Sequence, residues 1–156
     1  MGITDNEVID IQLESPKKRF RINGDNTKMI ELNPSDVNII SRLHETYKKL
    51  RGMATQAGSL LVDQQETDVE EELARLSEAL TNLDKEMREM IDYLFDSPVS
   101  DVLANGMNMY SPFNGEFWFE HCIEVLSKLY ENNLDAEFAK MKTKVQKHTA
   151  KYTGKS

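Results

Sequence analysis

Cysteine is nearly absent from the sequence, because Cys122 is the only one among 156 residues. A lone thiol cannot form an internal disulfide, and it excludes zinc sites that need several cysteines. The chain also lacks the run of roughly 18 apolar residues that a membrane-spanning helix needs. Its opening residues, MGITDNEVID, contain no basic start followed by an apolar stretch, so no secretory signal is predicted. We therefore expect a protein of a reducing compartment, the cytosol.

Motifs for catalysis and cofactor binding are missing as well. The sequence has no GxGxxG and no GxxxxGK, so nucleotide chemistry has no support. The three histidines, His44, His121 and His148, lack companion ligands at the spacing of helical metal sites. His121 precedes Cys122, but on a helix the two side chains point in different directions and cannot form a nucleophile and base pair. We expect no enzymatic activity, no cofactor and no metal ion.

The charge of the chain is unevenly distributed. Residues 134–156 contain six lysines and two acids, a balance of +4, so the remainder must carry −12 of the total of −8. Residues 63–96 contain twelve acids and three bases, a balance of −9. Such a segment repels phosphates, so a nucleic-acid partner is not expected, although the basic segment could attract phosphates or an acidic protein. Solvated helix faces are the simpler interpretation of both segments.

The composition predicts one folded domain that spans residues 1–156, since 39% of the residues are hydrophobic and 29% are charged. Its first part predicts a small sheet. Ile9, Ile11 and Leu13 alternate with polar residues, as in a strand with one buried face. The residues SPKK then form a turn, and Asn23-Gly24 suits a tight hairpin. We expect a three-stranded antiparallel meander over residues 7–32.

Two long helices are predicted next, over residues 34–62 and 67–96. Asn33 can cap the first helix with Pro34 at its first position, and Thr67 or Asp68 can cap the second. A short polar connection between two apolar stripes favours an antiparallel helical hairpin. A coiled coil between two chains is the alternative, because the second stripe keeps heptad spacing. The stripes comprise Ile40, Leu43, Tyr47, Leu50, Ala54, Ala57 and Leu61, and Val69, Leu73, Leu76, Leu80, Leu83, Met87, Met90 and Leu94.

The last third predicts further helices around a loop. Ser97-Pro98 ends the second long helix, and VSDVLA forms a short one. The segment NGMNMYSPFNG contains two Asn-Gly pairs and a proline, which indicates a structured loop. Helices follow over residues 116–132 and 134–152, and residues 153–156 are expected to fray. The predicted fold class is α+β, mostly α, with a short N-terminal antiparallel meander, a long antiparallel helical hairpin and two further helices.

Aromatic and methionine residues of this region form the candidate binding surface. The helix over residues 116–132 has apolar residues over nearly half its circumference, which is wider than one neighbouring helix needs. Flexible methionines beside aromatic rings make adaptable contacts for a protein partner. A loop that folds over the core is the alternative interpretation. The candidate partner-binding residues are Met107, Met109, Tyr110, Phe113 and Trp118.

Three segments of the chain carry a resemblance to a known family. They are KKRFRINGDNTKMIELNPSDVNIISRLHETYKKL, IDYLFDSPVSDVLANGMNMYSPFNGEFWFEH and EFAKMKTKVQKHTAKYT, which together make up more than half of the chain. The chain resembles a family of small phage and prophage proteins of Gram-positive bacteria. Members of that family are grouped with the tail assembly chaperones of long-tailed phages.

The resemblance implies a protein that binds without catalysing a reaction. Tail assembly chaperones coat the long helical tape measure protein in the host cytoplasm and are later displaced by subunits of the tail tube. The tape measure protein is therefore the expected partner, with the tail tube protein or a second copy of the chain as further partners. Two other functions stay open. The acidic residues 63–96 could mimic nucleic acid in an inhibitor of a host defence system, or the chain could be a structural tail or connector subunit.

Overall fold

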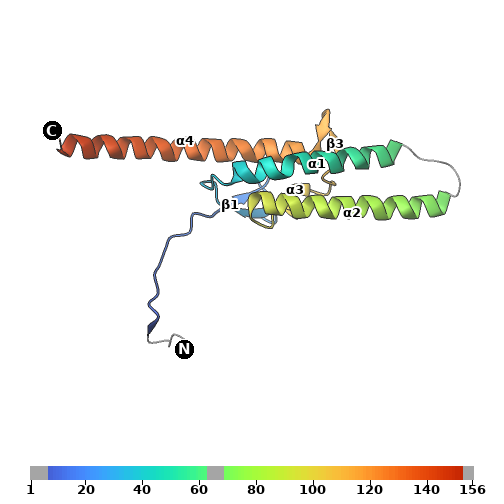
Figure 1. Ribbon diagram of the computed structural model, residues 1–156, viewed down its shortest axis with the longest axis horizontal. Helices are drawn as coiled ribbons and strands as arrows, with labels where there is room; N and C mark the ends of the chain where they lie inside the picture. Colours follow the sequence, from blue (N-terminus) through green and yellow to red (C-terminus); the bar gives the residue numbers. More distant parts are fainter. Residues whose placement is uncertain (1–6, 63–68, 153–156) are drawn as a thin grey trace.

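The computed structural model describes residues 7–62 and 69–152 of the chain, without the side chains of Val145 and of residues 148–152. Helices dominate, and two antiparallel hairpins form the β structure, so the predicted fold class, α+β and mostly α, is confirmed. The helices α1, α2 and α4 run alongside one another, α4 projects beyond the other two, and the N-terminal residues leave the body as an extended arm (Figure 1). The elements are β1 (Lys18–Arg21), β2 (Met29–Leu32), α1 (Ile39–Val62), α2 (Val69–Phe95), α3 (Ser100–Ala104), β3 (Pro112–Phe113), β4 (Glu116–Phe117) and α4 (Trp118–Tyr152).

The predicted antiparallel hairpin of two long helices is confirmed by α1 and α2, which pack against each other along their length. On α1, the facing positions Leu50, Ala54 and Ala57 are completely buried. On α2, Met87 and Ile91 are equally buried. Removal of each large side chain of this kind from water contributes about 1.5–3 kcal/mol to folding. The predicted caps of the second helix, residues 67 and 68, lie outside the described residues.

The heptad stripe of α2 is buried only in its second half. Leu83 and Met87 are buried, whereas Val69 and Leu73, near the start of the helix, are 66% and 53% exposed. The stripe does not form one continuous buried seam, because α3, the loop after it and α4 cover only the second half of α2. The core therefore lies near the open end of the hairpin.

The helix α1 begins at Ile39, later than the predicted start at residue 34. The side chain of Asn33 accepts a hydrogen bond from the N–H of Ser35 at 3.0 Å, and that of Asp36 accepts one from the N–H of Asn38 at 3.0 Å. Short polar side chains that bond to the backbone two residues later stabilise turns in competition with helix. Two successive turns therefore occupy residues 33–38, and the prediction of Asn33 as the helix cap was wrong.

The N-terminal meander has two strands rather than the predicted three. β1 and β2 pair antiparallel, with Phe20 opposite Ile30, and the turn at Asn23 and Gly24 has the positive φ angles predicted for it. Residues 8–17 form no strand and extend away from the body. Proline restricts the residue before it to extended geometry, so the chain runs straight through Ser15-Pro16 instead of reversing. The alternation of residues 9–13 does not lead to a strand within this chain.

The loop over residues 105–115 is compact and ends in a second, smaller hairpin. β3 and β4 pair across Asn114 and Gly115, whose φ angles of 50° and 78° suit the tight turn that Asn-Gly sequences favour. Glu116 and Phe117 therefore belong to a strand, and α4 begins at Trp118 rather than at the predicted residue 116. The predicted short helix before the loop is confirmed as α3.

The C-terminal region forms one continuous helix, α4, instead of the two predicted over residues 116–132 and 134–152. Asn132 and Asn133 are weak helix formers, but they do not break a helix as proline does. Asn133 also donates a hydrogen bond to the Ser35 hydroxyl at 3.0 Å, which fixes this part of α4 against the segment before α1. The second half of α4 extends past the body, where Phe138 and Met141 are 57% and 55% exposed.

None of the helices in the described part of the chain has the length and apolar character that a membrane crossing requires.

Candidate helix-binding groove

The structure divides the five predicted partner-binding residues between the core and the surface. Met109 is completely buried and Tyr110 is 7% exposed, so neither is available to a partner, and for these two residues the alternative of a loop over the core holds. Met107 and Trp118 are half-buried. Phe113, at 37% exposure, is the only one of the five that reaches the surface substantially.

Polar contacts to α2 hold the loop in the core. The Asp84 carboxylate accepts a hydrogen bond from the N–H of Met109 at 2.7 Å and forms an ion pair with Arg88 at 2.7 Å. Arg88 in turn donates to the carbonyl of Met107 at 3.2 Å. Burial raises the pKa of the Tyr110 hydroxyl, which also accepts a hydrogen bond from the Asn108 side chain at 2.8 Å. The loop is therefore part of the framework of the fold.

The exposed remainder of the predicted surface is a small aromatic cluster. The rings of Phe113 and Trp118 meet edge to face with centroids 5.3 Å apart, and His121 lies 5.4 Å from Phe113. The indole N–H of Trp118 donates to the carbonyl of Leu103 at 2.9 Å, which ties α4 to α3. An edge-to-face pair of this kind stabilises the local structure. The cluster therefore attaches the hairpin of β3 and β4 to the start of α4.

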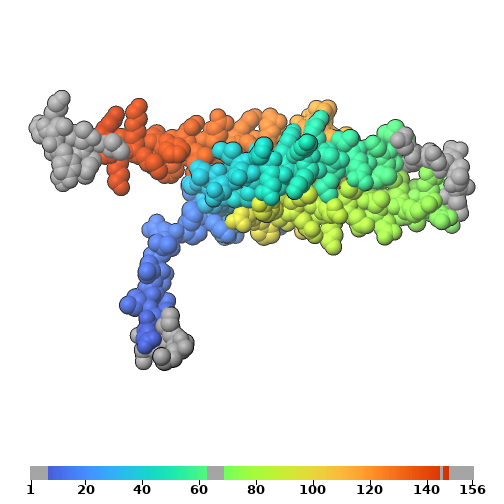
Figure 2. Space-filling view, in the orientation of Figure 1, coloured from blue at the N-terminus to red at the C-terminus, as the bar shows by residue number. Residues whose placement is uncertain are grey.

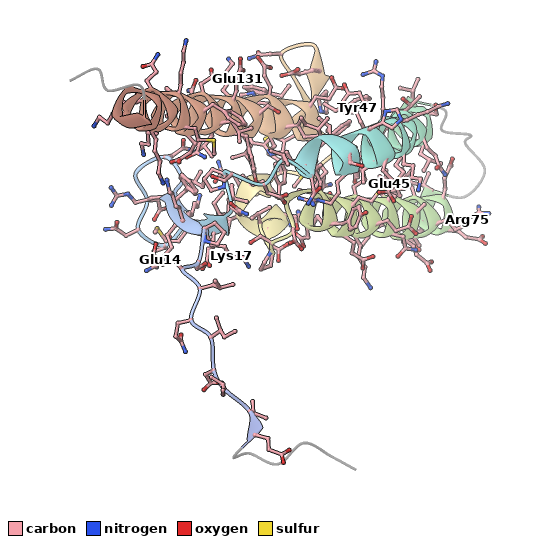
Figure 3. The ribbon with its side chains drawn as sticks, turned by 60° about the vertical axis from the view of Figure 1, so that its left-hand side comes forward. Glu14, Lys17, Glu45, Tyr47, Arg75 and Glu131 are labelled. Atoms are coloured by element: carbon pink, nitrogen blue, oxygen red, sulfur yellow. The ribbon has the colours of Figure 1, made fainter. Side chains whose placement is uncertain are left out.

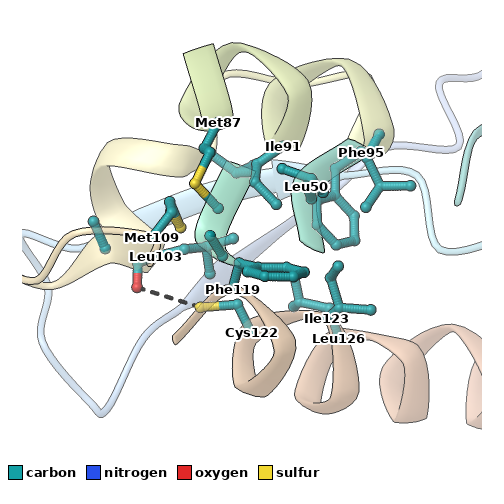
Figure 4. Packing of buried hydrophobic residues seen from close by; sticks show 14 of the residues in the cluster. Leu50, Met87, Ile91, Phe95, Leu103, Met109, Phe119, Cys122, Ile123 and Leu126 are labelled. Carbon is teal, nitrogen blue, oxygen red and sulfur yellow. Dashed lines mark hydrogen bonds between the residues drawn. The ribbon is translucent and has the colours of Figure 1, made fainter. Parts of the chain in front are cut away.

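Cys122 is buried beside this cluster and has no reactive character. Its thiol lies 3.7 Å from the carbonyl of Leu103 and faces the core, as Figure 4 shows. Burial raises the pKa of the Cys122 thiol to about 12. Because the thiolate is the nucleophile, the raised pKa and the burial both suppress reaction of this thiol in the folded protein.

We predict that a thiol reagent modifies Cys122 at the rate at which the protein opens. Alkylation should be at least about 100-fold slower in the folded protein than in denaturant, because both burial and the raised pKa suppress the thiolate. The measurement is the mass increase with time at pH 8. Ser59→Cys in a Cys122→Ala background places a thiol on exposed α1 and should react rapidly. Equal rates at the two positions would contradict the assignment.

An apolar groove lies where the start of α1, the end of α2 and the middle of α4 meet. Its volume is about 250 Å³. The side chain of Ile40 stands at its rim and is 69% exposed, whereas Phe95 and Tyr130 form buried walls and stack with centroids 6.3 Å apart. The residues that line it are Ile39, Ile40, Leu43, Leu94, Phe95, Ile123, Ser127, Tyr130, Glu131 and Leu134.

Polar contacts of Arg42 join the start of α1 to the end of α2, two of the elements that form the groove. Arg42 forms an ion pair with Asp36 at 2.5 Å and donates to the carbonyl of Leu94 at 2.9 Å, one of the carbonyls that the end of α2 leaves without a helical partner. Partial burial opposes ionisation of Asp36, but hydrogen bonds from Arg42 and from the N–H of Asn38, with the charge of Arg42, lower its pKa. Burial raises the pKa of Tyr130 to about 12, and the nearby charge of Asp36 adds to the effect. Tyr130 is therefore neutral at physiological pH.

The apolar side of α4 continues from the groove beyond the body. Ile123, Tyr130 and Leu134 line the groove, and Phe138 and Met141 follow on the same side of the helix. Steps of three and four residues keep these side chains on one face. Ile123 and Tyr130 are buried walls of the groove, at 7% and 4% exposure, so the open part of this face runs from Leu134 to Met141 and is about 10 Å long at 1.5 Å per residue. We call this surface, from the groove to Met141, the α4 track.

The groove was not predicted as a site. Ile40 and Leu43 belong to a predicted apolar stripe, and Ile123 and Tyr130 lie on the wide apolar face predicted for residues 116–132, but no signal in the sequence places the two beside each other. The wide apolar face predicted for residues 116–132 was the available signal. The structure uses one part of that face for the core and leaves another part open at the groove.

Among the side chains that the structure describes, no three of His, Cys, Asp or Glu converge in a way that could hold a metal ion. Comparisons with protein-family models, with curated proteins and with solved structures gave no match.

Proposed function

We propose that the protein is a non-catalytic tail assembly chaperone of a long-tailed phage, and that it binds an amphipathic helical segment of the tape measure protein. The observation that carries the proposal is the α4 track, which begins in an apolar groove between three helices. A helix can lay its apolar face into such a groove and anchor side chains at spacings of three and four residues. The sequence resemblance to phage proteins supplies the identity of the ligand.

The dimensions of the track support a helical ligand rather than a small molecule. The exposed stretch of about 10 Å on α4, added to the groove, matches about two turns of a partner helix at 1.5 Å per residue. The groove alone is near the lower limit for a small-molecule site, which is about 300 Å³. A tape measure protein is long and helical, so it offers many segments of this length. Several copies of the chaperone could therefore cover one tape measure chain until tube subunits displace them.

The exposed apolar side chains of the track also support a partner that covers them. Ile40, Phe138 and Met141 are each more than half exposed, on two helices that meet at the groove. Exposed apolar groups that are contiguous rather than scattered mark interaction surfaces.

We predict that Ile40→Glu weakens capture of the tape measure protein without unfolding the chaperone. A charge at the exposed rim of the groove does not disturb the core, but it leaves an unpaired carboxylate against the apolar face of the ligand. Affinity should fall at least about 10-fold. The measurement is co-purification after co-expression with a tape measure protein from the same genome, followed by titration with the captured segment.

Val62→Glu is the matched control. Val62 is 82% exposed on the same helix, at the end of α1 away from the groove, so its replacement should leave capture unchanged. Thermal unfolding of both variants should resemble that of the unmodified chain. If Ile40→Glu captures the partner as well as Val62→Glu does, the groove is not the binding site. If no tape measure segment is captured by the unmodified chain, the proposed function is wrong.

A further inference from the structure

The outer edge of β1 is open. β1 forms hydrogen bonds with β2 on one side, and among the described strands no other pairs with it. An edge strand presents backbone N–H and C=O groups that can bind another strand, and a two-stranded sheet gains stability from a third. The edge is also basic, because Lys18, Arg19 and Arg21 are exposed on it.

The N-terminal arm, residues 8–14, has the properties of a strand without a neighbour. Ile9, Ile11 and Leu13 are 86%, 82% and 89% exposed, although their alternation with Asp10 and Gln12 is typical of a strand with one buried face. Figure 2 shows the arm standing away from the helices and hairpins of the body. A partner surface that covers these three exposed apolar side chains would remove them from water and stabilise the arm.

The arm and the edge of β1 match in both apolar pattern and charge. In β1, Phe20 packs against the core, whereas Arg19 faces the solvent. An antiparallel register that places Leu13 beside Phe20 also places Glu14 beside Arg19, and it places Ile11 beside Ile22, the residue that follows β1. Apolar neighbours and opposite charges in directly opposed positions stabilise a sheet. A slip by one residue would reverse the faces and destroy both matches at once.

The direction of the arm points to a second copy of the chain as the partner. To reach this register on its own β1, the chain would have to reverse within residues 15–18. Pro16 holds Ser15 extended, and Figure 3 shows Glu14 on the arm, which is already directed away from the body beyond Lys17. A second copy meets no such restriction. Two copies can exchange arms about a two-fold axis, which satisfies both edges and closes the assembly.

We propose that the N-terminal arm of one copy adds to the edge of β1 of a second copy as a third antiparallel strand, and that the exchange is reciprocal. Each copy thereby completes a three-stranded sheet with an apolar face toward its core and an alternating charged face toward solvent. None of residues 8–14 and 18–22 lines the groove.

Charge reversal across the interface tests the exchange in the full-length protein. Arg19→Glu places two acids opposite each other, and Glu14→Arg places two bases opposite each other, so each variant alone should dimerise more weakly by on the order of 10-fold. An equimolar mixture restores an opposite-charge pair at both arms and should form a heterodimer as stable as the unmodified dimer. Sedimentation equilibrium over a concentration series measures all three samples. Arg21 is left unchanged because it bonds to Asn26 within the hairpin at 2.6 Å.

Glu78→Arg, an exposed reversal on α2, is the control with the same change in net charge as Glu14→Arg, and it should dimerise like the unmodified chain. Amide hydrogen exchange of residues 8–14 should slow as the concentration of the unmodified chain rises. An unmodified chain that stays monomeric would overturn the proposal, as would a mixture that stays monomeric. Protection of the arm without any dependence on concentration would show that the arm pairs with its own β1, and would equally reject the exchange.

Discussion

Replacement of Phe119 by alanine is expected to lower the free energy of unfolding by about 3–5 kcal/mol. Phe119 is completely buried at the start of α4, and its ring meets Tyr47 edge to face and stacks on Phe117. Figure 4 places it in the middle of the cluster, near Leu50 and Met109, so it joins the helical hairpin to the loop. Alanine would leave a cavity that rigid helices on several sides cannot close.

Val125→Ala is the control on the same helix. Val125 is 52% exposed, so its replacement should change the free energy of unfolding by less than about 1 kcal/mol. Urea unfolding followed by circular dichroism measures both variants. If the slope of the free energy of unfolding against urea concentration is unchanged, the cavity alone is responsible for the loss of stability. A loss below about 1 kcal/mol for Phe119→Ala would contradict its position at the centre of the core.

The long helices could be predicted from sequence because their signals are local. Steps of three and four residues in α1 and α2 require nothing beyond the segment itself, and Pro98 ends the second helix whatever surrounds it. The turns at Asn23-Gly24 and Asn114-Gly115 are local in the same sense, since positive φ angles are a property of those residues. Helix boundaries were less accurate, because short side chains such as Asn33 bond equally well within turns.

The surroundings of each element could not be predicted in the same way. The alternation in residues 9–13 indicates a strand with one buried face, but it does not indicate which surface covers that face. Met109 and Phe113 are equally apolar in sequence, yet the N–H of Met109 is held by Asp84, 25 positions earlier in the chain, and that contact decides which residue is in the core. The groove likewise depends on how three helices meet. Such long-range pairings carry no signal in a single sequence.

Replacement of Asp84 by alanine is expected to lower the free energy of unfolding by about 2–4 kcal/mol, and to loosen the loop over residues 105–115 first. The side chain of Asp84 is only 13% exposed and holds two groups at once, the guanidinium of Arg88 and the N–H of Met109. Alanine leaves both donors without this acceptor in a partly buried site. Asp84→Asn keeps an oxygen for the N–H of Met109 and should recover part of the loss.

Asp101→Ala distinguishes the loop anchor from a general effect on Arg88. Asp101 binds the same guanidinium at 2.9 Å, but its side chain is 88% exposed, and exposed ion pairs contribute about 0–1 kcal/mol. Amide hydrogen exchange at Met109 should accelerate at least about 10-fold in Asp84→Ala and remain nearly unchanged in Asp101→Ala, because only Asp84 bonds to that N–H. If both replacements accelerate exchange equally, the guanidinium holds the loop through the carbonyl of Met107. The hydrogen bond from the N–H of Met109 to Asp84 would then contribute less to holding the loop than the ion pair between Asp84 and Arg88.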